Sequence, residues 1–222
     1  MPAVIHQHPA ATSPQGSAVS RAPVTVLEWW HWFGRQGGWE FPTPQSLHPT
    51  QMPAPYRQLL VHGQDMTSTL ERFYRTRLGL RALRREHRDP YYVREVLLLT
   101  SDGMAVEYGV ICVRLRAFPP AMQEDILAER LPLGRLLQEH DQPCICRPQE
   151  FYRIAPHPYL NSRFEGMPVP EFYYGRRNLL LNGEHRLLAD VLEILSPLAD
   201  QTKGPLPVDY AARFGQVITE DE

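Results

Sequence analysis

Six stretches of the chain have the pattern of apolar and polar positions that is typical of β-strands. In order, they are LRALRREH (80–87), YYVREVLLLT (91–100), MAVEYGVICVRL (104–115), CICRPQEFYRIA (144–155), EFYYGRRNLLL (171–181) and EHRLLADVLEIL (184–195). Aromatic and β-branched residues dominate them, and turn residues separate them. The Ser-Asp-Gly at 101–103 and the Asn-Gly at 182–183 favour tight hairpins, so at least two strand pairs are predicted to be antiparallel.

Helical spacing of apolar residues occurs before these stretches and once between them. Asp65 is a typical N-cap, and apolar residues follow it at helical spacing as far as position 73. Residues 55–62 predict a short helix, and residues 119–140 predict a helical excursion from the sheet. Several strands are apolar on both faces, which predicts cover on both sides. The predicted fold class is α+β, with a six-stranded antiparallel sheet wrapped by helices.

The predicted organisation is one folded domain between two polar segments. Residues 1–23 are rich in Pro, Ala, Ser and Gln and predict a disordered N-terminal segment. Residues 24–197 predict a single domain large enough to enclose a cavity, and residues 198–222 a C-terminal tail. The domain starts with a segment, 24–39, that holds all four tryptophans and is expected to be a packed flap.

Composition and short motifs argue against several classes of function. The 23 Lys and Arg against 25 Asp and Glu give a net charge of −2, which would not attract nucleic acid or an anionic membrane. The sequence has neither a signal-peptide pattern nor the roughly 18 apolar residues of a membrane span, so a cytoplasmic location is expected. Metal-site spacings, phosphate loops and serine-hydrolase elbows are missing as well. No metal and no cofactor are therefore predicted.

A charge on an apolar strand face points to a binding site. Arg94 shares its face with apolar residues of its strand, and an unpaired buried ion is costly. Asp190, on an apolar face of the last strand, is its predicted counterpart. If both faced one cavity, the guanidinium would bind a planar carboxylate and the carboxyl group would bind or protonate an oxygen at the far end. The alternative is an ordinary Arg–Asp ion pair within the sheet.

Four motifs occur in a familiar order: DMTSTLERF, YYVREVLLLTSDG, LPLGRLL and GRRNLLLNGEHRLLADVLEILSP. Together they resemble the chorismate lyase family over about residues 56–197. The resemblance implies an antiparallel sheet with an internal ligand cavity beneath helical flaps. It also implies a carbon–oxygen lyase that eliminates pyruvate from chorismate, giving the 4-hydroxybenzoate of ubiquinone biosynthesis or a related hydroxybenzoate.

The resemblance also implies roles for individual residues. The implied catalytic residues are Arg94 and Asp190, and the implied substrate-binding residues are Met66, Arg94, Leu133, Arg176 and Arg177. The family has a glutamate where Asp190 stands, and a misplacement of about 1 Å can cost roughly a hundredfold in rate. Glu193 is not expected to replace it, because an offset of three residues places the two on opposite faces.

A non-catalytic binder or sensor of a small aromatic carboxylic acid is the second hypothesis. Ligand-binding domains of some bacterial transcription regulators resemble this fold, but they follow a winged-helix module, and the roughly fifty residues before the predicted domain core are too few and too rich in proline for one. A related lyase with another product is a third hypothesis. In each case the expected partner is a small molecule rather than nucleic acid or a membrane, and a monomer or small homo-oligomer is expected.

Overall fold

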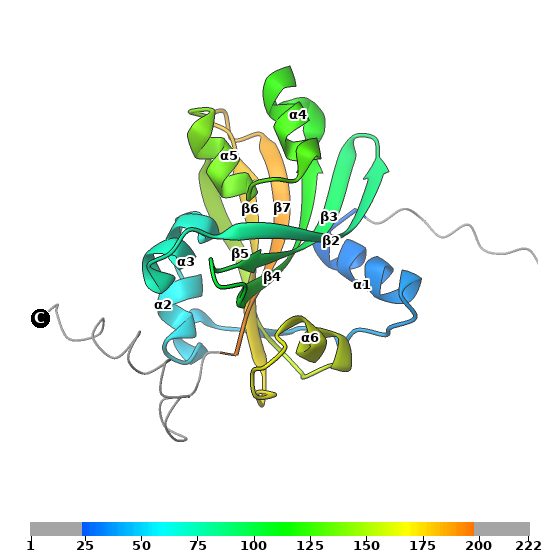
Figure 1. Ribbon diagram of the computed structural model, residues 1–222, viewed down its shortest axis with the longest axis vertical. Coiled ribbons are helices and arrows are strands. Elements are labelled where there is room, and N and C mark those ends of the chain that lie inside the picture. Colours follow the sequence, from blue (N-terminus) through cyan, green and yellow to red (C-terminus); the bar gives the residue numbers. More distant parts are fainter. Residues whose placement is uncertain (1–23, 198–222) are drawn as a thin grey trace, which may run out of the picture.

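The computed structural model describes residues 24–197, which are built around an antiparallel sheet. Figure 1 shows the sheet at the centre of the molecule. Its strand order is β1-β5-β6-β7-β4-β3-β2. The strands are β1 (Gln45–Leu47), β2 (Gly79–Arg88), β3 (Tyr91–Leu99), β4 (Ala105–Arg114), β5 (Ile145–Ile154), β6 (Tyr173–Leu181) and β7 (Leu187–Leu195). The α+β class and the antiparallel sheet are thus confirmed, with seven strands in place of six. The segments 1–23 and 198–222, predicted as disordered and as a tail, lie outside the described residues.

The additional strand is β1, in the proline-rich segment that follows the tryptophans. It has only three residues and pairs with β5 through Gln45↔Arg153 and Leu47↔Phe151. Three residues cannot display an alternating pattern, so the sequence alone gives no sign of this strand.

Six α-helices accompany the sheet in the described part of the chain. They are α1 (Val26–Gln36), α2 (Tyr56–Leu60), α3 (Met66–Tyr74), α4 (Pro120–Ala128), α5 (Leu133–Glu139) and α6 (Pro158–Arg163). Asp65 caps α3 as its sequence predicts, because its carboxylate accepts a hydrogen bond of 2.8 Å from the Ser68 backbone nitrogen. None of these helices is long and apolar enough to cross a membrane.

Strand register decides which side chains share a face of the sheet. Arg94 of β3 pairs with Ile111 of β4, and Ile111 pairs with Val191 of β7, so these three side chains point to the same side. Cys112 pairs with Asp190, which places both on the opposite side. We call the side of Arg94 the α5 face and the side of Asp190 the α1 face.

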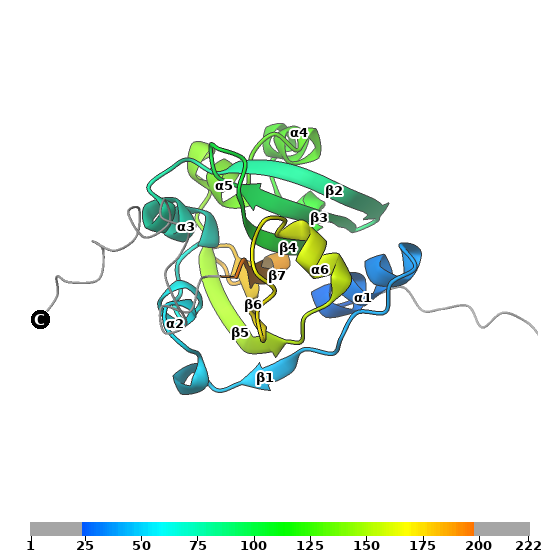
Figure 2. The same ribbon diagram turned by 60° about the horizontal axis from the view of Figure 1, so that its bottom comes forward.

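The α1 face is covered by helices α1 and α6, which lie beside each other in Figure 2. Most of the tryptophan-rich segment forms helix α1, which buries Trp29, Trp30 and Phe33 against the sheet, while Trp39 follows the helix and is exposed. The α5 face carries two further apolar clusters, one with α4 and α5 and the other with α2 and α3. The sheet is therefore covered on both sides, as the apolar character of its strands predicts.

Candidate functional site

Arg94 is a buried arginine with few hydrogen-bond partners. Arg94 is only 1% exposed. Its Nη1 donates a hydrogen bond of 3.2 Å to the Ile126 backbone oxygen, and its Nε has no hydrogen-bond partner among the described residues. Within residues 24–197, no carboxylate lies at ion-pair distance from it. Burial lowers the pKa of Arg94, and the nearby Tyr92 and Glu129 partly offset this. The guanidinium is thus a buried cation with no carboxylate in direct contact among the described residues.

Arg94 borders a cavity between the α5 face of the sheet and the first residues of α3 and α5. The cavity has a volume of about 60 Å³. Its walls are mainly apolar and include Met66, Val96, Ile111, Leu133, Leu180 and Val191. Its polar wall groups are Asp65, Thr67, Arg94, Glu107 and Glu193. A mainly apolar cavity with a small number of charged groups is typical of a small-molecule site.

Two glycines shape the cavity. At Gly134 a Cβ would lie 2.9 Å from both Asp65 Oδ1 and Thr67 Oγ1, so the missing side chain lets the start of α5 approach the start of α3. At Gly109 a Cβ would lie 3.3 Å from Glu107 Oε1 and from Val96 Cγ2. Gly109 therefore leaves free the space over which the Glu107 side chain extends.

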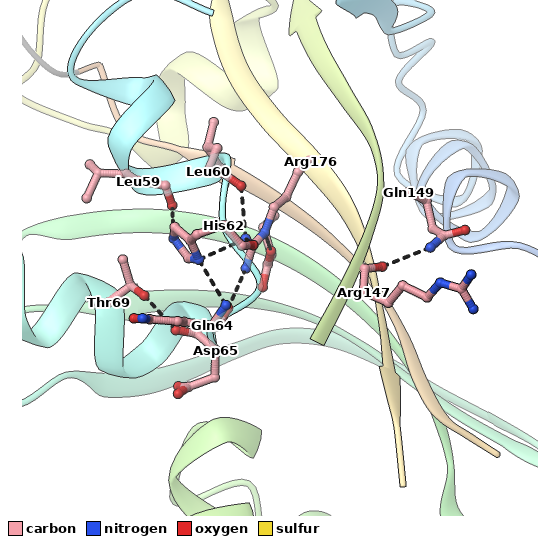
Figure 3. A network of polar contacts seen from close by, with 10 residues as sticks. Leu59, Leu60, His62, Gln64, Asp65, Thr69, Arg147, Gln149 and Arg176 are labelled. Atoms are coloured by element: carbon pink, nitrogen blue, oxygen red, sulfur yellow. Dashed lines mark hydrogen bonds and ion pairs between the residues drawn. The ribbon is translucent and has the colours of Figure 1, made fainter. Parts of the chain in front are cut away.

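Two acidic residues of the cavity wall, Glu107 and Glu193, have Arg176 as a neighbour. Arg176 Nε donates to Glu193, and its Nη1 donates to the backbone oxygens of Leu60 and His62, both at 2.9 Å. Figure 3 shows these carbonyl oxygens around the guanidinium, and Gln64 adds another at 3.2 Å. All three nitrogens of the Arg176 guanidinium therefore donate hydrogen bonds within the protein.

Glu107 differs from Glu193, because its Oε2 has no partner in the described residues although the residue is only 4% exposed. Burial raises the pKa of the Glu107 carboxyl group well above its usual value. The Glu193 carboxylate raises this pKa further, and Arg176 lowers it. Glu107 is accordingly a buried carboxyl group for which the neutral form is favoured.

The expectation that Asp190 faces Arg94 across one cavity is wrong. Asp190 lies on the α1 face, where Arg177 Nε and Nη2 each donate to its carboxylate at 2.9 Å. The backbone nitrogen of Val26, at the start of α1, donates to it at 3.2 Å. Asp190 therefore forms an ordinary Arg–Asp ion pair within the sheet, as the alternative hypothesis expected, but its partner is Arg177.

The error has a simple geometric cause. Alternation along a strand says which residues of that strand share a face, but not which face of the sheet this is. The register between β3, β4 and β7 brings Val191, and with it Glu193, to the side of Arg94. Glu193, which was expected to face away from the site, is therefore in the cavity wall, and Asp190 is not.

The other predicted site residues are distributed over both faces. Met66 and Leu133 border the cavity together with Arg94. Arg176 is on the α5 face but is engaged by Glu193 and by backbone oxygens, and Arg177 is on the α1 face with Asp190. Glu107 was not predicted. The signal was available, because Glu107 is a lone acidic residue in an apolar strand, the same pattern that singled out Arg94.

Known proteins resemble this chain only in structure. No family model and no curated protein matches it. PhnF from Mycobacterium smegmatis matches with a TM-score of 0.46 and 8% identity, over 78% of this chain and 95% of that one. The ligand-binding domain of a putative GntR-family transcriptional regulator from Bordetella bronchiseptica matches with a TM-score of 0.43 and 14% identity. This match covers 55% of this chain and 86% of that one.

A third match is a possible transcriptional regulator, YydK, from Bacillus subtilis. Its TM-score is 0.44 with 7% identity, and the match covers 60% of this chain and 63% of that chain. Because similarities of this size carry no argument about function, a function has to be inferred from the geometry of the site.

The expectation of a carbon–oxygen lyase is corrected by the geometry of the site. The matching structures, several of which are named as transcriptional regulators or domains of them, give that expectation no support. Within this chain, the predicted catalytic pair is divided between the two faces of the sheet.

Residues 24–197 contain no group of three or more His, Cys, Asp or Glu side chains placed to hold a metal ion.

Proposed function

We propose that this protein is a non-catalytic binder of a small carboxylic acid, whose carboxylate Arg94 holds inside the cavity of the α5 face. The observation that carries the proposal is that Arg94 is 1% exposed, borders the cavity and has no carboxylate partner among the described residues. A buried charge without a partner is expensive, so a folded protein that keeps one gains most when an anion binds there.

Three other arginines, one fully buried and two partly buried, show how this protein normally treats such a charge. Arg84 and Arg176 each donate to a buried glutamate, and Arg177 binds Asp190 through two nitrogens. Arg94, in contrast, has one hydrogen-bond acceptor, the Ile126 backbone oxygen at 3.2 Å. Because its guanidinium presents several donors in one plane, a carboxylate is the ligand group that suits it best.

The volume of the cavity limits the ligand. About 60 Å³ is less than the roughly 150 Å³ of an engineered protein cavity that binds benzene. The described form of the protein therefore suits an acid smaller than benzoate. An aromatic acid would require the helices over the α5 face to move outward. The one cavity expected between Arg94 and Asp190 is not formed, since the two residues lie on opposite faces.

A ligand titration of the full chain tests the proposal. Acetate, propionate, butyrate and benzoate would be added at constant ionic strength, with thermal unfolding and amide NMR shifts as readouts. A ligand that binds only the native state raises its stability, so at least one of these acids is expected to raise the unfolding temperature of the wild type.

The matched variants are Arg94→Met and Arg81→Met. Arg81 is an exposed arginine of β2, and its replacement is expected to leave the response to acids unchanged. Arg94→Met is expected to abolish the response. Equal responses of Arg94→Met and the wild type, or no response of the wild type to any of the acids, would overturn the proposal.

A second measurement tests the absence of catalysis. Incubation of the protein with chorismate, coupled to lactate dehydrogenase, is expected to release pyruvate at the spontaneous rate only. Faster release that Arg94→Met abolishes would contradict a purely binding role.

A further inference from the structure

Glu107 is the buried charged group of the cavity wall that a carboxylate bound to Arg94 leaves unused. It is 4% exposed, it borders the same cavity as Arg94, and its Oε2 has no hydrogen-bond partner among the described residues. An unsatisfied buried oxygen of this kind usually requires an explanation, such as a ligand group.

The charged groups around Glu107 come from several elements. Glu193 of β7 and Arg176 of β6 act directly on its charge, while Arg94 of β3 and Asp65 before α3 border the same cavity. Arg176 is occupied by Glu193 and by the carbonyl oxygens before α3 (Figure 3). It is therefore not free to neutralise Glu107 as a direct partner.

Strand register places Glu107 and Arg94 at two ends of one space. Arg94 lies opposite Ile111, and Glu107 lies four residues before Ile111 on β4, on the same face. The Glu107 carboxyl group extends over Gly109, where a Cβ would be 3.3 Å from its Oε1. The carboxyl group therefore points along β4 in the direction of Ile111, the residue that pairs with Arg94.

We propose that Glu107, as a neutral carboxylic acid, forms a hydrogen bond with a hydroxyl group of the ligand, so that the ligand class is a small hydroxy-monocarboxylate. This inference rests on the proposed function, because Arg94 holds the carboxylate of the same molecule. The ligand thereby gains an orientation, with its anionic end at β3 and its hydroxyl at the start of β4.

Charge balance favours a hydroxyl over an ammonium group. Among the buried charged groups of the site, Glu193 and Arg176 neutralise each other, so with Glu107 protonated Arg94 is left as the buried charge that a monoanion matches. The half-buried Asp65 carboxylate, also in the wall, caps α3 through the Ser68 backbone nitrogen. An ammonium group would require Glu107 to ionise in a buried site beside the Glu193 carboxylate. A hydroxyl group requires no such ionisation.

The experiment compares acids that differ in one group. Glycolate, 3-hydroxypropionate and 4-hydroxybutyrate are each compared with the unsubstituted acid of the same length, and with glycine, β-alanine and 4-aminobutyrate. Dissociation constants come from amide NMR titrations of the wild-type chain. At one length or more, the hydroxy acid is expected to bind roughly three- to tenfold more tightly than the unsubstituted acid.

Two variants assign this preference to Glu107. Glu107→Gln keeps a neutral donor and acceptor of the same size, so it is expected to retain the preference for the hydroxy acid. Glu107→Leu removes both and is expected to bind the hydroxy and unsubstituted acids equally. Neither variant buries a new charge, and both are expected to fold.

Several outcomes would overturn the inference. They are a preference that persists in Glu107→Leu, tightest binding of an amino acid, a preference of the wild type that grows with pH, or equal binding of all acids. If the unsubstituted acids bind through Arg94 while the hydroxyl adds nothing, the inference fails and the proposed function stands. If none of the acids binds, the proposed function fails as well.

Discussion

On the α1 face, the buried Glu95 accepts hydrogen bonds from Arg84, Tyr108 and Tyr159, whereas on the α5 face its sequence neighbour Arg94 donates to one backbone oxygen. The two residues are adjacent in β3 and point to opposite sides of the same sheet. Asp190 extends the pattern of the α1 face, because Arg177 and the start of α1 bind it.

This difference in how buried charges are paired suggests different roles for the two faces of the sheet. The buried carboxylates Glu95 and Asp190 of the α1 face are bound by arginines of the protein, and α1 and α6 pack over that face. The α5 face keeps Arg94 and Glu107 with unsatisfied atoms beside a cavity. We therefore interpret the paired charges of the first face as structural, and ligand binding is the role that we propose for the second.

The largest predicted effect is on the α1 face, from Arg84→Met. The change would leave the fully buried Glu95 without its cation, and removing one partner of a buried pair typically costs about 3–5 kcal/mol. The free energy of unfolding, measured in guanidinium chloride with tryptophan fluorescence, is expected to fall by about 3 kcal/mol. The exposed Arg81→Met is the control, with an expected change within about 0.5 kcal/mol. Equal effects of the two variants would remove the basis of the comparison.

Asp190→Asn is expected to have the next largest effect. It removes the charge that Arg177 and the Val26 backbone nitrogen share, and hydrogen bonds to charged groups contribute about 1.5–3 kcal/mol. The free energy of unfolding is expected to fall by about 2 kcal/mol, while the affinity for acids in the NMR titration stays unchanged. Loss of acid binding without loss of stability would place Asp190 in the site after all.

Glu107 predicts a dependence of stability on pH. Its pKa is raised in the folded protein, so above the unfolded pKa the native state keeps a proton that the unfolded state has lost. Its contribution is therefore complete below the unfolded pKa, and it is lost as the pH rises toward the folded pKa, by at most about 1.4 kcal/mol per pH unit.

Glu107→Gln should remove this loss. The difference in unfolding free energy between variant and wild type is therefore expected to grow in favour of the variant from pH 5 to pH 8. Parallel pH profiles of the two proteins would show that Glu107 does not stay protonated in the folded state.

The smallest predicted effect on stability is that of Arg94→Met, and its sign is opposite to that of Arg84→Met. An apolar side chain of similar length removes an uncompensated charge, so the free energy of unfolding is expected to rise by about 1 kcal/mol without ligand. A fall of about 3 kcal/mol, as for Arg84→Met, would show that Arg94 has a structural partner.

Much of the sheet can be predicted from the sequence. Strands β2 to β7 correspond to the six predicted stretches, because alternation and turn residues act within a few neighbouring positions. Strand β1 and helix α6 could not be predicted, since they have three and six residues and depend on contacts with distant segments. Short elements carry too little pattern of their own.

The candidate site could be predicted in part. The charge on an apolar strand singles out Arg94, and the resemblance adds Met66 and Leu133, which border the same cavity. The choice of Asp190 failed because the face of a strand depends on its register with its neighbours, which no single strand encodes. Counting lone charges in every apolar strand would have added Glu107.

Arg176 also limits how a molecule reaches the interior. Its guanidinium ties residues 60–64, which lead into α3, to strand β6, so the beginning of α3 cannot swing away without breaking these bonds (Figure 3). A molecule that enters or leaves the cavity should therefore do so without displacing residues 60–64, and amide hydrogen exchange around residues 60–66 should be slow.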